Sequence, residues 1–454
     1  MLNIKFIREH ADKIRDVVRK RNFDPKKADV DKLLQLDDEK NNLQNKIDIL
    51  RTRRNQIAGS MKQDHSNQEL INEGRKVKLK IADLENKLAA ITHEWQEVMD
   101  WIPNLPLDDV PEGKGEADNL EIKAWSPKLK YLAKEKLYGA QGSSQEMTRF
   151  GTNGDYEFTP KPHWEIGKEL DIIDLEAGAK VSGSRFYYLK KDGVLIMYAI
   201  FDLLMKKLLA EGFIPMSVPL LVRNKALYGS SHFPGDADQI YKIDSENVED
   251  NNQLYLVGST EPPLFAYYLD QVLNLKNLPV KIMALSPCFR SEAGSWGKDV
   301  RGMKRAHQFD KLEMDMIIEA DLGKAYETHE YLLSLNEWLL QGLELPYHVI
   351  NMCMGDLGYA AAAKKYDIEV WLPSTGEFME TMSNTIATDF QARRLNIRYK
   401  DKNGKLQFVY TLNNTGATHR LLIAILDHYQ QSDGSVKVPE VLKGYLGKDK
   451  ISKA

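Results

Sequence analysis

Apolar or long side chains in the first quarter of the chain recur in alternating steps of three and four. The first series consists of Leu33, Leu36, Lys40, Leu43, Ile47, Leu50, Arg54, Ile57 and Met61. A second series runs from Leu70 to Ile102, and the polar stretch KQDHSNQ separates the two. Because such steps align side chains along one side of a helix, the pattern predicts an antiparallel helical hairpin. At 1.5 Å per residue, arms of roughly 30 to 35 residues are about 50 Å long.

Beyond residue 113 the pattern changes to shorter segments, several of which alternate apolar and polar residues. It predicts strands over 214–222, 278–292, 306–319, 366–373 and 406–413, and helices over 194–213, 320–343 and 417–431. The expected fold class is therefore α+β, a mostly antiparallel sheet flanked by helices, with an N-terminal two-helix coiled-coil arm. The expected domains are 1–112 and 113–454, with a polar insertion at about 125–155 that contains a short helix.

The composition of the chain limits the classes of protein to which it can belong. The 454 residues carry a net charge of -4, which argues against nucleic-acid binding by bulk attraction and allows local basic patches. The two cysteines cannot form a disulfide framework, and no Cys/His spacing fits a zinc site. No apolar run is long enough for a membrane span, and no secretory signal or P-loop is recognisable, so we expect a cytoplasmic protein without membrane contact.

One hairpin concentrates fixed positive charge in this slightly acidic chain. The stretch CFRSEAGSWGKDVRGMKRAHQFDKLEM, residues 288–314, joins two apolar segments through a glycine-containing loop. It carries the cations Arg290, Lys298, Arg301, Lys304 and Arg305. A cluster of this kind either binds an anionic ligand or forms salt bridges on an exposed hairpin.

The edges of this hairpin favour a nucleotide ligand. Arg290 and Glu292 are two residues apart, so we expect both on one face of an extended strand. His307, Phe309 and Lys311 are expected on one face of the returning strand. A guanidinium group pairs with a phosphate, and an aromatic ring stacks on a base.

Two shorter segments carry polar residues suited to smaller ligands. Ser259, Thr260 and Glu261 lie between a predicted strand and a helix start, where they either bind an ammonium and a hydroxyl group or cap the helix. The segment FMETMSNT offers Glu380 and Ser383 as oxygen donors for Mg²⁺, a signal that is weak by itself.

A third segment, TLNNTGATHRLLIAIL, places a cation beside an apolar helix. We expect Asn413 and Thr415 at the head of this helix and Arg420 inside it. A buried arginine is costly unless it is paired, so Arg420 either binds a phosphate or forms a buried ion pair.

Taken in order, these segments resemble those of the seryl-tRNA synthetases, a family of class II aminoacyl-tRNA synthetases. The stretch from Phe289 to Met314 resembles motif 2 of that family, GFIPMSVPLLV resembles motif 1, and TLNNTGATHR resembles motif 3. PHWEIG, AKVSGSRFYYL, DFQARRLNIRY and the N-terminal start are further matches. The resemblance covers nearly the whole chain except the insertion.

The resemblance implies a six-to-seven-stranded antiparallel sheet, a homodimer formed partly through motif 1, and ATP-dependent ligation of L-serine to tRNA(Ser). Serine reacts with ATP to give seryl-adenylate and diphosphate, and the tRNA then takes the seryl group, leaving AMP. Serylation of tRNA(Sec) is also implied in an organism that has this tRNA. The cofactors implied are ATP, as a substrate, and Mg²⁺.

The family's site residues carry over to matching positions of this chain. The resemblance implies catalytic roles for Arg290, Arg420 and Glu380, and a metal site at Glu380 and Ser383. The implied ATP-binding residues are Arg290, Ser291, Glu292, Phe309, Glu380, Thr381, Met382, Ser383 and Arg420. The implied serine-binding residues are Ser259, Thr260, Glu261, Arg290, Glu313, Asn413 and Thr415.

The chain departs from the family's pattern at three places. The usual Thr-x-Glu triplet appears as Ser259-Thr260-Glu261, Met382 stands where a serine is common, and motif 3 reads NNTGATHR without the common Gly-Ser-Gly. These positions lie in segments expected to form the substrate pockets.

The basic residues of the helical hairpin have two interpretations. They are Arg51, Arg53, Lys62, Arg75, Lys76, Lys78, Lys80 and Lys87, mixed with acidic residues. They form either a solvated charged face or a surface that contacts phosphates, and the resemblance implies that the arm recognises the shape of a tRNA. An adenylate-forming relative without a tRNA substrate, or a non-catalytic RNA-binding relative, are the alternatives; the intact arm and the four residues Arg290, Glu292, Glu380 and Arg420 argue against them.

Overall fold

The computed structural model describes residues 1–62, 66–127, 156–244, 252–293 and 301–453. The chain divides into two compact units, Met1–Pro103 and Asn104–Ala454. Within the described residues, no helix combines the length and the apolar character that crossing a membrane would require.

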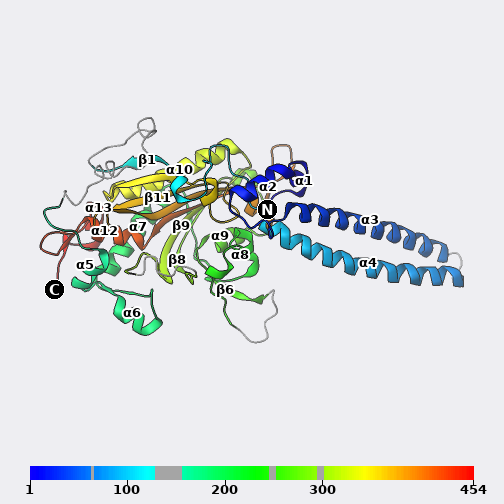
Figure 1. Ribbon diagram of the computed structural model, residues 1–454, viewed down its shortest axis with the longest axis horizontal. Coiled ribbons are helices and arrows are strands. Elements are labelled where there is room, and N and C mark those ends of the chain that lie inside the picture. The colour runs from blue at the N-terminus through cyan, green and yellow to red at the C-terminus, as the bar shows by residue number, and fades with distance from the viewer. Residues whose placement is uncertain (63–65, 128–155, 245–251, 294–300, 454) are drawn as a thin grey trace. The chain divides into compact units, whose positions relative to one another are not determined.

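The first unit consists of helices. Two short helices, α1 (Ile4–Glu9) and α2 (Ala11–Lys20), precede the long helices α3 (Val30–Met61) and α4 (Gln68–Trp101), which pack side by side as the predicted hairpin (Figure 1). We call α3 and α4 the arm. Asp29 and Asn67 cap the two long helices by accepting hydrogen bonds from the amides of Lys32 and Leu70.

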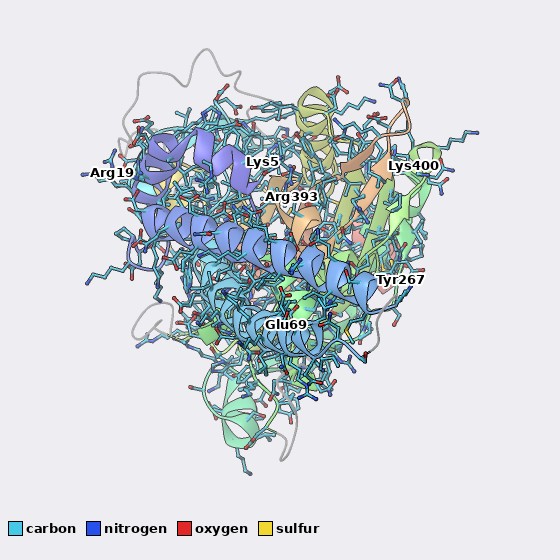
Figure 2. All side chains as sticks on the ribbon, turned by 90° about the vertical axis from the view of Figure 1, so that its right-hand side faces the viewer. Lys5, Arg19, Glu69, Tyr267, Arg393 and Lys400 are labelled. Carbon is cyan, nitrogen blue, oxygen red and sulfur yellow. The ribbon has the colours of Figure 1, made fainter. Side chains whose placement is uncertain are left out.

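Apolar contacts hold the two helices of the arm together. Near its tip, Ile57 of α3 packs with Val77 and Ile81 of α4, so the predicted seam is confirmed. The outer faces are charged, and Figure 2 shows Lys5 and Arg19 at the surface of the shorter helices of the same unit. The heptad pattern alone therefore specified this part of the fold.

An eight-stranded sheet forms the centre of the second unit. Its strands, in spatial order, are β1 (Leu120–Trp125), β10 (Tyr347–Asn351), β11 (Lys364–Leu372), β12 (Glu377–Thr388), β15 (Tyr410–Thr418), β9 (Gln308–Ile318), β8 (Val280–Phe289) and β4 (Ile214–Pro215). All neighbours are antiparallel except β4 and β8. The α+β class is confirmed. The sheet exceeds the six to seven expected strands because a strand joins at each edge.

The two faces of the sheet have different partners. Helices α7 (Asp192–Ala210), α10 (Leu322–Gly342) and α12 (Arg420–His428) contribute to the main apolar core together with Leu312, Met314 and Met316 of β9. Residues that alternate with these on β9 point to the opposite face. That face is flanked by α8 (Asn224–Ser230), α9 (Glu261–Ala266) and α11 (Phe390–Leu395).

Smaller elements surround the sheet. They are the helices α5 (His163–Glu169), α6 (Leu175–Ser182) and α13 (Glu440–Leu446), the strand pairs β2 (Ile173–Asp174) with β3 (Tyr188–Leu189), β5 (Leu221–Arg223) with β6 (Leu254–Leu256) and β16 (Val436–Lys437) with β17 (Lys450–Ile451), and the three-stranded sheet of β7 (Val272–Leu273), β13 (Arg398–Lys400) and β14 (Leu406–Phe408). Four 3-10 turns complete the described fold: Glu116–Asp118, Ala237–Gln239, Leu275–Asn277 and Met354–Asp356.

Several predicted boundaries are wrong. The strand predicted over 214–222 is split into β4 and β5, which belong to different sheets, and the strand predicted over 406–413 is split into β14 and β15. The helix predicted from residue 417 begins at Arg420, because β15 continues to Thr418. Asn413 and Thr415 therefore lie on a strand rather than at a helix head. The helix expected in the insertion falls on residues 128–155, outside the described ones.

Candidate active site

A polar pocket lies on the sheet face opposite to the main core. It is lined by Arg290, Glu292, Lys304, Arg305, Ala306, Phe309, Lys311, Glu380, Thr381, Ser383, Thr415, Thr418, His419 and Arg420, and we call it the cationic pocket. Its lining includes five lysine and arginine side chains and two glutamates. This excess of positive charge suits a ligand with several negative charges, such as a polyphosphate.

A β-bulge in β12 brings Glu380 and Ser383 into this pocket together. Met382 pairs with Ile368, whereas Glu380 pairs with the next residue of β11, so Thr381 is an extra residue in β12. Side chains three residues apart normally point to opposite faces of a strand. The inserted residue shifts the alternation, and both Glu380 and Ser383 line the cationic pocket.

The neighbouring strand β15 repeats this arrangement. Thr415 pairs with Glu313 and Ala417 pairs with the adjacent residue Leu312, which leaves Gly416 as the extra residue. Thr415 and Thr418 consequently both line the pocket. A methyl group at position 416 would lie 2.9 Å from a methyl carbon of Leu204 and 3.2 Å from the Leu312 carbonyl oxygen, so the bulge fits glycine best.

Arg290 lies at the end of β8 with its guanidinium group above the ring of Phe309. The guanidinium carbon is 5.4 Å from the ring centroid, and Nε donates a hydrogen bond of 3.2 Å to the Gly258 carbonyl oxygen. The expectation that Glu292 continues the same extended strand is wrong, because β8 ends at Phe289 and Glu292 has a left-handed backbone with φ of 51°. The turn nevertheless leaves both Arg290 and Glu292 in the pocket lining.

Arg420 is the first residue of α12 and pairs with Glu380 of β12. Its Nη1 lies 3.2 Å from Glu380 Oε2 and donates to the Glu380 carbonyl oxygen at 2.7 Å, while its Nε donates to the Lys304 carbonyl oxygen at 3.3 Å. Burial alone would raise the pKa of Glu380, but Arg420 and Lys365 outweigh it and lower this pKa to about 2. Glu380 is therefore ionised at neutral pH, as a metal ligand requires.

A buried hydrogen-bonded network adjoins the cationic pocket. We call it the Glu261 cluster; its members are Ser259, Glu261, Lys311, Glu313, Tyr359, Gln391, Thr411 and Asn413. Glu261 Oε1 accepts hydrogen bonds from Gln391 Nε2 at 2.6 Å and from Asn413 Nδ2 at 3.1 Å. The same Asn413 nitrogen donates to the Tyr359 hydroxyl oxygen at 2.6 Å. The cluster thus presents oriented oxygens and amides in a site that excludes bulk water.

Lys311 joins the cluster to the cationic pocket. Its ammonium nitrogen lies 2.5 Å from Glu313 Oε2 and donates to the Ser259 hydroxyl oxygen at 3.1 Å, and its side chain also lines the pocket. Burial, together with the nearby charge of Glu313, raises the pKa of Glu261 to about 8. A cationic ligand beside Glu261 would favour its ionised form, so the cluster is suited to an ammonium group.

Most of the predicted site residues meet in these two places. The cationic pocket holds Arg290, Glu292, Phe309, Glu380, Thr381, Ser383, Thr415 and Arg420. The Glu261 cluster holds Ser259, Glu261, Glu313 and Asn413.

Three predicted residues point elsewhere. Met382 lies in the main core, where its sulfur accepts a hydrogen bond from Asn336 Nδ2 at 3.2 Å, because the alternation of β12 turns it away from the pocket. Thr260 is buried and contacts the Ala284 carbonyl oxygen at 3.4 Å, whereas Ser291 donates to the Asp238 carbonyl oxygen. Neither residue lines the cationic pocket.

The sequence did not indicate the supporting residues Tyr359, Gln391 and Thr411. Thr411 donates to the Gln391 side-chain oxygen at 2.6 Å, which fixes the amide so that its nitrogen faces Glu261. Gln391 occurs in the segment DFQARRLNIRY, whose resemblance was noted without a role. Polar residues within a segment that is otherwise buried were the available signal.

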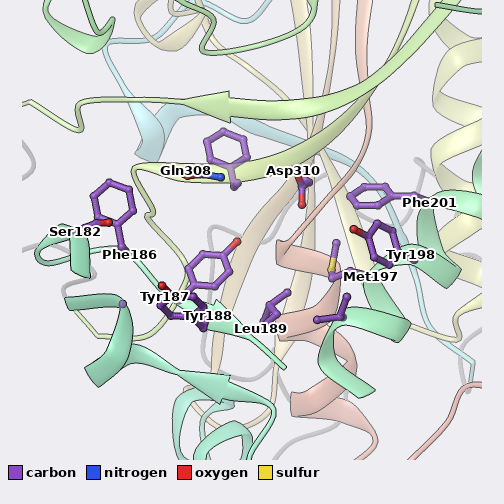
Figure 3. A pocket seen from close by; sticks show the side chains of 13 residues that line it. Ser182, Phe186, Tyr187, Tyr188, Leu189, Met197, Tyr198, Phe201, Gln308 and Asp310 are labelled. Atoms are coloured by element: carbon purple, nitrogen blue, oxygen red, sulfur yellow. The ribbon is translucent and has the colours of Figure 1, made fainter. Parts of the chain in front are cut away.

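A larger cavity of about 390 Å³ lies beside the cationic pocket and shares Phe309 with it. Figure 3 shows Phe186, Tyr187 and Phe201 around this cavity, together with Asp310 from β9. Its lining is rich in aromatic side chains and lacks the lysine and arginine side chains of the cationic pocket, so it is poorly suited to a phosphate.

Within the described residues, no group of three or more His, Cys, Asp and Glu side chains is placed to hold a metal ion. A metal at Glu380 and Ser383 would therefore need further oxygen ligands from water or from a bound phosphate.

Comparison with known proteins agrees with this geometry. Residues 1–106 match the seryl-tRNA synthetase N-terminal domain, and residues 241–429 match the class II tRNA synthetase core domain (G, H, P, S and T). A serine–tRNA ligase of Dictyoglomus turgidum is 38% identical over 455 residues, which cover 99% of both chains.

Two solved structures match over nearly their full length. The crystal structure of seryl-tRNA synthetase from Pyrococcus horikoshii complexed with ATP is 36% identical, with a TM-score of 0.86 and complete coverage of both chains. The cytoplasmic serine–tRNA ligase from Naegleria fowleri in complex with AMP is 27% identical, with a TM-score of 0.80 over 100% of this chain and 99% of that one. The resemblance drawn from the motifs is confirmed, and this chain belongs to the serine–tRNA ligase family of class II aminoacyl-tRNA synthetases.

Proposed function

We propose that this chain ligates L-serine to tRNA(Ser) in two steps, with ATP as the energy source. The observation that carries the proposal is the contiguity of the cationic pocket and the Glu261 cluster through Lys311, since this arrangement suits a polyphosphate beside an amino acid. The Pyrococcus horikoshii and Naegleria fowleri relatives were solved in complex with ATP and AMP, respectively, which supports a nucleotide in the cationic pocket.

In the first step, a carboxylate oxygen of serine attacks the α-phosphorus of ATP. The bond from this phosphorus to the bridging oxygen breaks, and diphosphate leaves. Arg290 stabilises the charge that develops on the α-phosphate, because its guanidinium group is fixed by the Gly258 carbonyl oxygen. Phe309 stacks on the adenine and Arg420 binds the γ-phosphate, as the resemblance implies.

The Glu261 cluster binds the amino acid. Glu261 and Glu313 accept hydrogen bonds from the ammonium group, while Ser259, Asn413 and Thr415 surround the hydroxyl group. A pocket built to hydrogen-bond a hydroxyl group rejects alanine strongly, because its own polar groups would be left without partners.

In the second step, the 3′-terminal ribose hydroxyl of the tRNA attacks the carbonyl carbon of seryl-adenylate. The ester bond to the tRNA forms, AMP leaves, and the hydroxyl proton is released. The arm positions the tRNA by its shape, and exposed Arg75, Lys76, Lys78 and Lys80 of α4 are available for phosphate contacts.

Mg²⁺ fits the donor set beside Arg420. Glu380 and Ser383 supply a carboxylate and a hydroxyl oxygen in the same pocket, and Asp367 pairs with Ser383 across the strands. Asp367 Oδ2 accepts a hydrogen bond from Lys365 Nζ at 2.9 Å, whereas its buried Oδ1 has no hydrogen-bond partner among the described residues and is open to a cation. Glu380 and Ser383 would hold the ion, whose charge would offset that of the phosphates.

A homodimer accounts for the exposed apolar residues of α7 and β4. Leu195, Tyr198 and Leu209 of α7 and Ile214 of β4 are about half exposed, although large apolar side chains are usually buried. Ile214 lies in the segment that resembles motif 1, residues 212–222, and the other three residues lie on α7, the helix that precedes this segment. If these residues form the dimer interface, a Tyr198→Glu variant should dissociate into single chains. Light scattering, which measures the molar mass in solution, tests this.

ATP–pyrophosphate exchange across serine, threonine, alanine and cysteine tests the proposed chemistry. We expect serine to support rapid exchange and alanine to support almost none. Equal stimulation by all four amino acids would contradict the assignment of serine. Exchange without any dependence on an amino acid would contradict the adenylate-forming reaction itself.

A further inference from the structure

Two buried histidines hold the backbone of one residue, Met303, at the edge of the cationic pocket. The return segment, which we define as residues 301–307, leads into β9. Within it, the Met303 amide donates a hydrogen bond of 2.9 Å to His163 Nε2, and the Met303 carbonyl oxygen accepts one of 2.8 Å from His419 Nε2. His163 begins α5 and His419 precedes α12, so elements from distant parts of the sequence meet at the Met303 backbone.

The hydrogen bonds assign opposite tautomers to the two rings. His163 Nε2 is an acceptor, so its proton resides on Nδ1, whereas His419 Nε2 is a donor. Burial, followed by the nearby Lys304, lowers the pKa of His163 to about 3. Burial, followed by Arg420, lowers the pKa of His419 to about 3 as well. Both rings are therefore neutral at physiological pH, and the hydrogen bond that His163 Nε2 accepts requires this of His163.

Gly302 shows how closely the return segment approaches His163. Its φ of 79° is in the left-handed region, and an added Cβ would lie 2.2 Å from His163 Nε2 and 2.9 Å from a ring carbon of Trp164. A side chain at position 302 would therefore displace the imidazole ring from Met303. Backbone conformation and close approach both require glycine here.

Met303 is adjacent to residues that line the cationic pocket. Lys304 and Arg305 follow Met303 directly, and the Lys304 carbonyl oxygen accepts a hydrogen bond from Arg420 Nε at 3.3 Å. The His419 ring also packs on Phe309, with 5.1 Å between the ring centroids. The position of Met303 thus affects two cations and the aromatic ring on one side of the pocket.

We propose that His163 and His419 are positioning residues that fix the Met303 backbone, and thereby preset Lys304, Arg305 and Phe309 for the nucleotide. This inference rests on the proposed function, because it assigns the nucleotide to the cationic pocket. Neither histidine is required to exchange a proton with the substrate. Their contribution is to remove conformational freedom from the return segment before ATP binds.

A set of three variants tests this role. His163→Phe keeps a ring but loses the acceptor, His163→Gln keeps an acceptor oxygen, and Gly302→Ala disturbs the same contact from the other side. We expect His163→Phe and Gly302→Ala to raise the KM for ATP about tenfold in pyrophosphate exchange, with the KM for serine within about twofold of the parent value. His163→Gln should recover most of the affinity for ATP.

His428→Phe is a matched control. His428 also contacts a backbone carbonyl oxygen, that of Trp371 at 2.6 Å, and burial lowers its pKa to about 4, but it does not line the cationic pocket. This variant should be less stable to heat and keep the parent KM for ATP. Equal effects of His428→Phe and His163→Phe on that KM would overturn the positioning role.

Hydrogen–deuterium exchange provides a readout that does not depend on catalysis. The Met303 amide should exchange faster in folded His163→Phe than in the parent protein, and at the parent rate in His428→Phe. Unchanged exchange at Met303 would overturn the proposal. If the parent protein itself lacked serine-dependent pyrophosphate exchange while Met303 behaved as expected, the proposed function would fail and the structural contact would stand.

Discussion

The arm and the eight-stranded sheet obtain their structure from contacts of different range. In the arm, a repeating pattern along α3 and α4 generates one seam, as in the packing of Ile57 with Val77 and Ile81. In the sheet, β15 lies between β12 and β9, and β9 is about a hundred residues away in sequence. The arm therefore depends on a periodic pattern, and the site depends on the register between distant strands.

The charged pairs of the two regions differ in how strongly water screens them. Arg51 and Glu85 on the arm are 2.8 Å apart, but each side chain is 46% exposed, so water screens the pair and it contributes little to stability. Lys311 and Glu313 beside the cationic pocket are 2.5 Å apart, and their side chains are only 9% and 2% exposed, so water screens this pair far less. Charges on the arm are suited to a large external partner, whereas those in the pocket act on atoms at short range.

Replacing Arg290 by alanine should have the largest effect and should affect only the chemistry of the second unit. Loss of a guanidinium group aimed at the reacting phosphate should reduce the rate of serine-dependent pyrophosphate exchange by about a hundredfold to a thousandfold. Binding of tRNA, measured by filter retention, should remain near the parent value. Near-normal exchange would contradict the role of Arg290. Lys400→Ala is the control, because the Lys400 side chain is exposed at the end of β13, and it should leave the exchange rate unchanged.

Removing the arm should impair tRNA charging and largely preserve pyrophosphate exchange, the reverse of the result expected for Arg290→Ala. The Lys40 ammonium lies 3.7 Å from the Trp95 ring centroid, so α3 and α4 face each other there and residues 41–94 can be replaced by a short glycine linker. We expect exchange within about twofold of the parent rate and a loss of tRNA charging of at least about a hundredfold. Efficient charging by the shortened protein would contradict the tRNA-binding role of the arm.

Gly416→Ala tests how strictly the site depends on one bulge. The added methyl group would press on Leu204 and on the Leu312 carbonyl oxygen, so we expect a loss of about 1–3 kcal/mol in the free energy of unfolding, together with slower exchange. Urea denaturation measures the loss. Gly444→Ala is the matched control, because an added Cβ there meets nothing within 4 Å. Equal stability of both variants would show that the bulge tolerates a side chain.

Glu261→Gln should change how the stability of the second unit depends on pH. The pKa of Glu261 is about 8 in the folded chain, above its ordinary value of 4.5, so the group's contribution to stability is complete below pH 4.5 and is lost as the pH rises to 8. Between pH 5 and 8, the free energy of unfolding of the parent should therefore fall relative to the variant, by at most about 1.4 kcal/mol per pH unit. Denaturant titrations at each pH give the free energy of unfolding. If this free energy changed with pH in the same way in the parent and the variant, the raised pKa of Glu261 would be refuted.

Sequence patterns predicted the segments that form the candidate site, but not the direction of every side chain within them. The motif matches identified Arg290, Phe309, Glu380 and Arg420, which all line the cationic pocket. The same matches also suggested Met382, whose side chain lies in the core. A motif specifies residue types in order, but the direction of each side chain depends on strand alternation and on where a bulge interrupts it.

The sequence by itself determined the arm, the α+β class and the order of the chemical segments, because heptads, alternation and motifs are local patterns. Only the tertiary structure decided that Glu380 and Ser383 share a pocket, that Gln391 orients Glu261, and that His163 and His419 meet at Met303. Each of these arrangements joins residues through cross-strand register or through contacts between distant elements. Such contacts follow from packing of the whole chain, which no local pattern specifies.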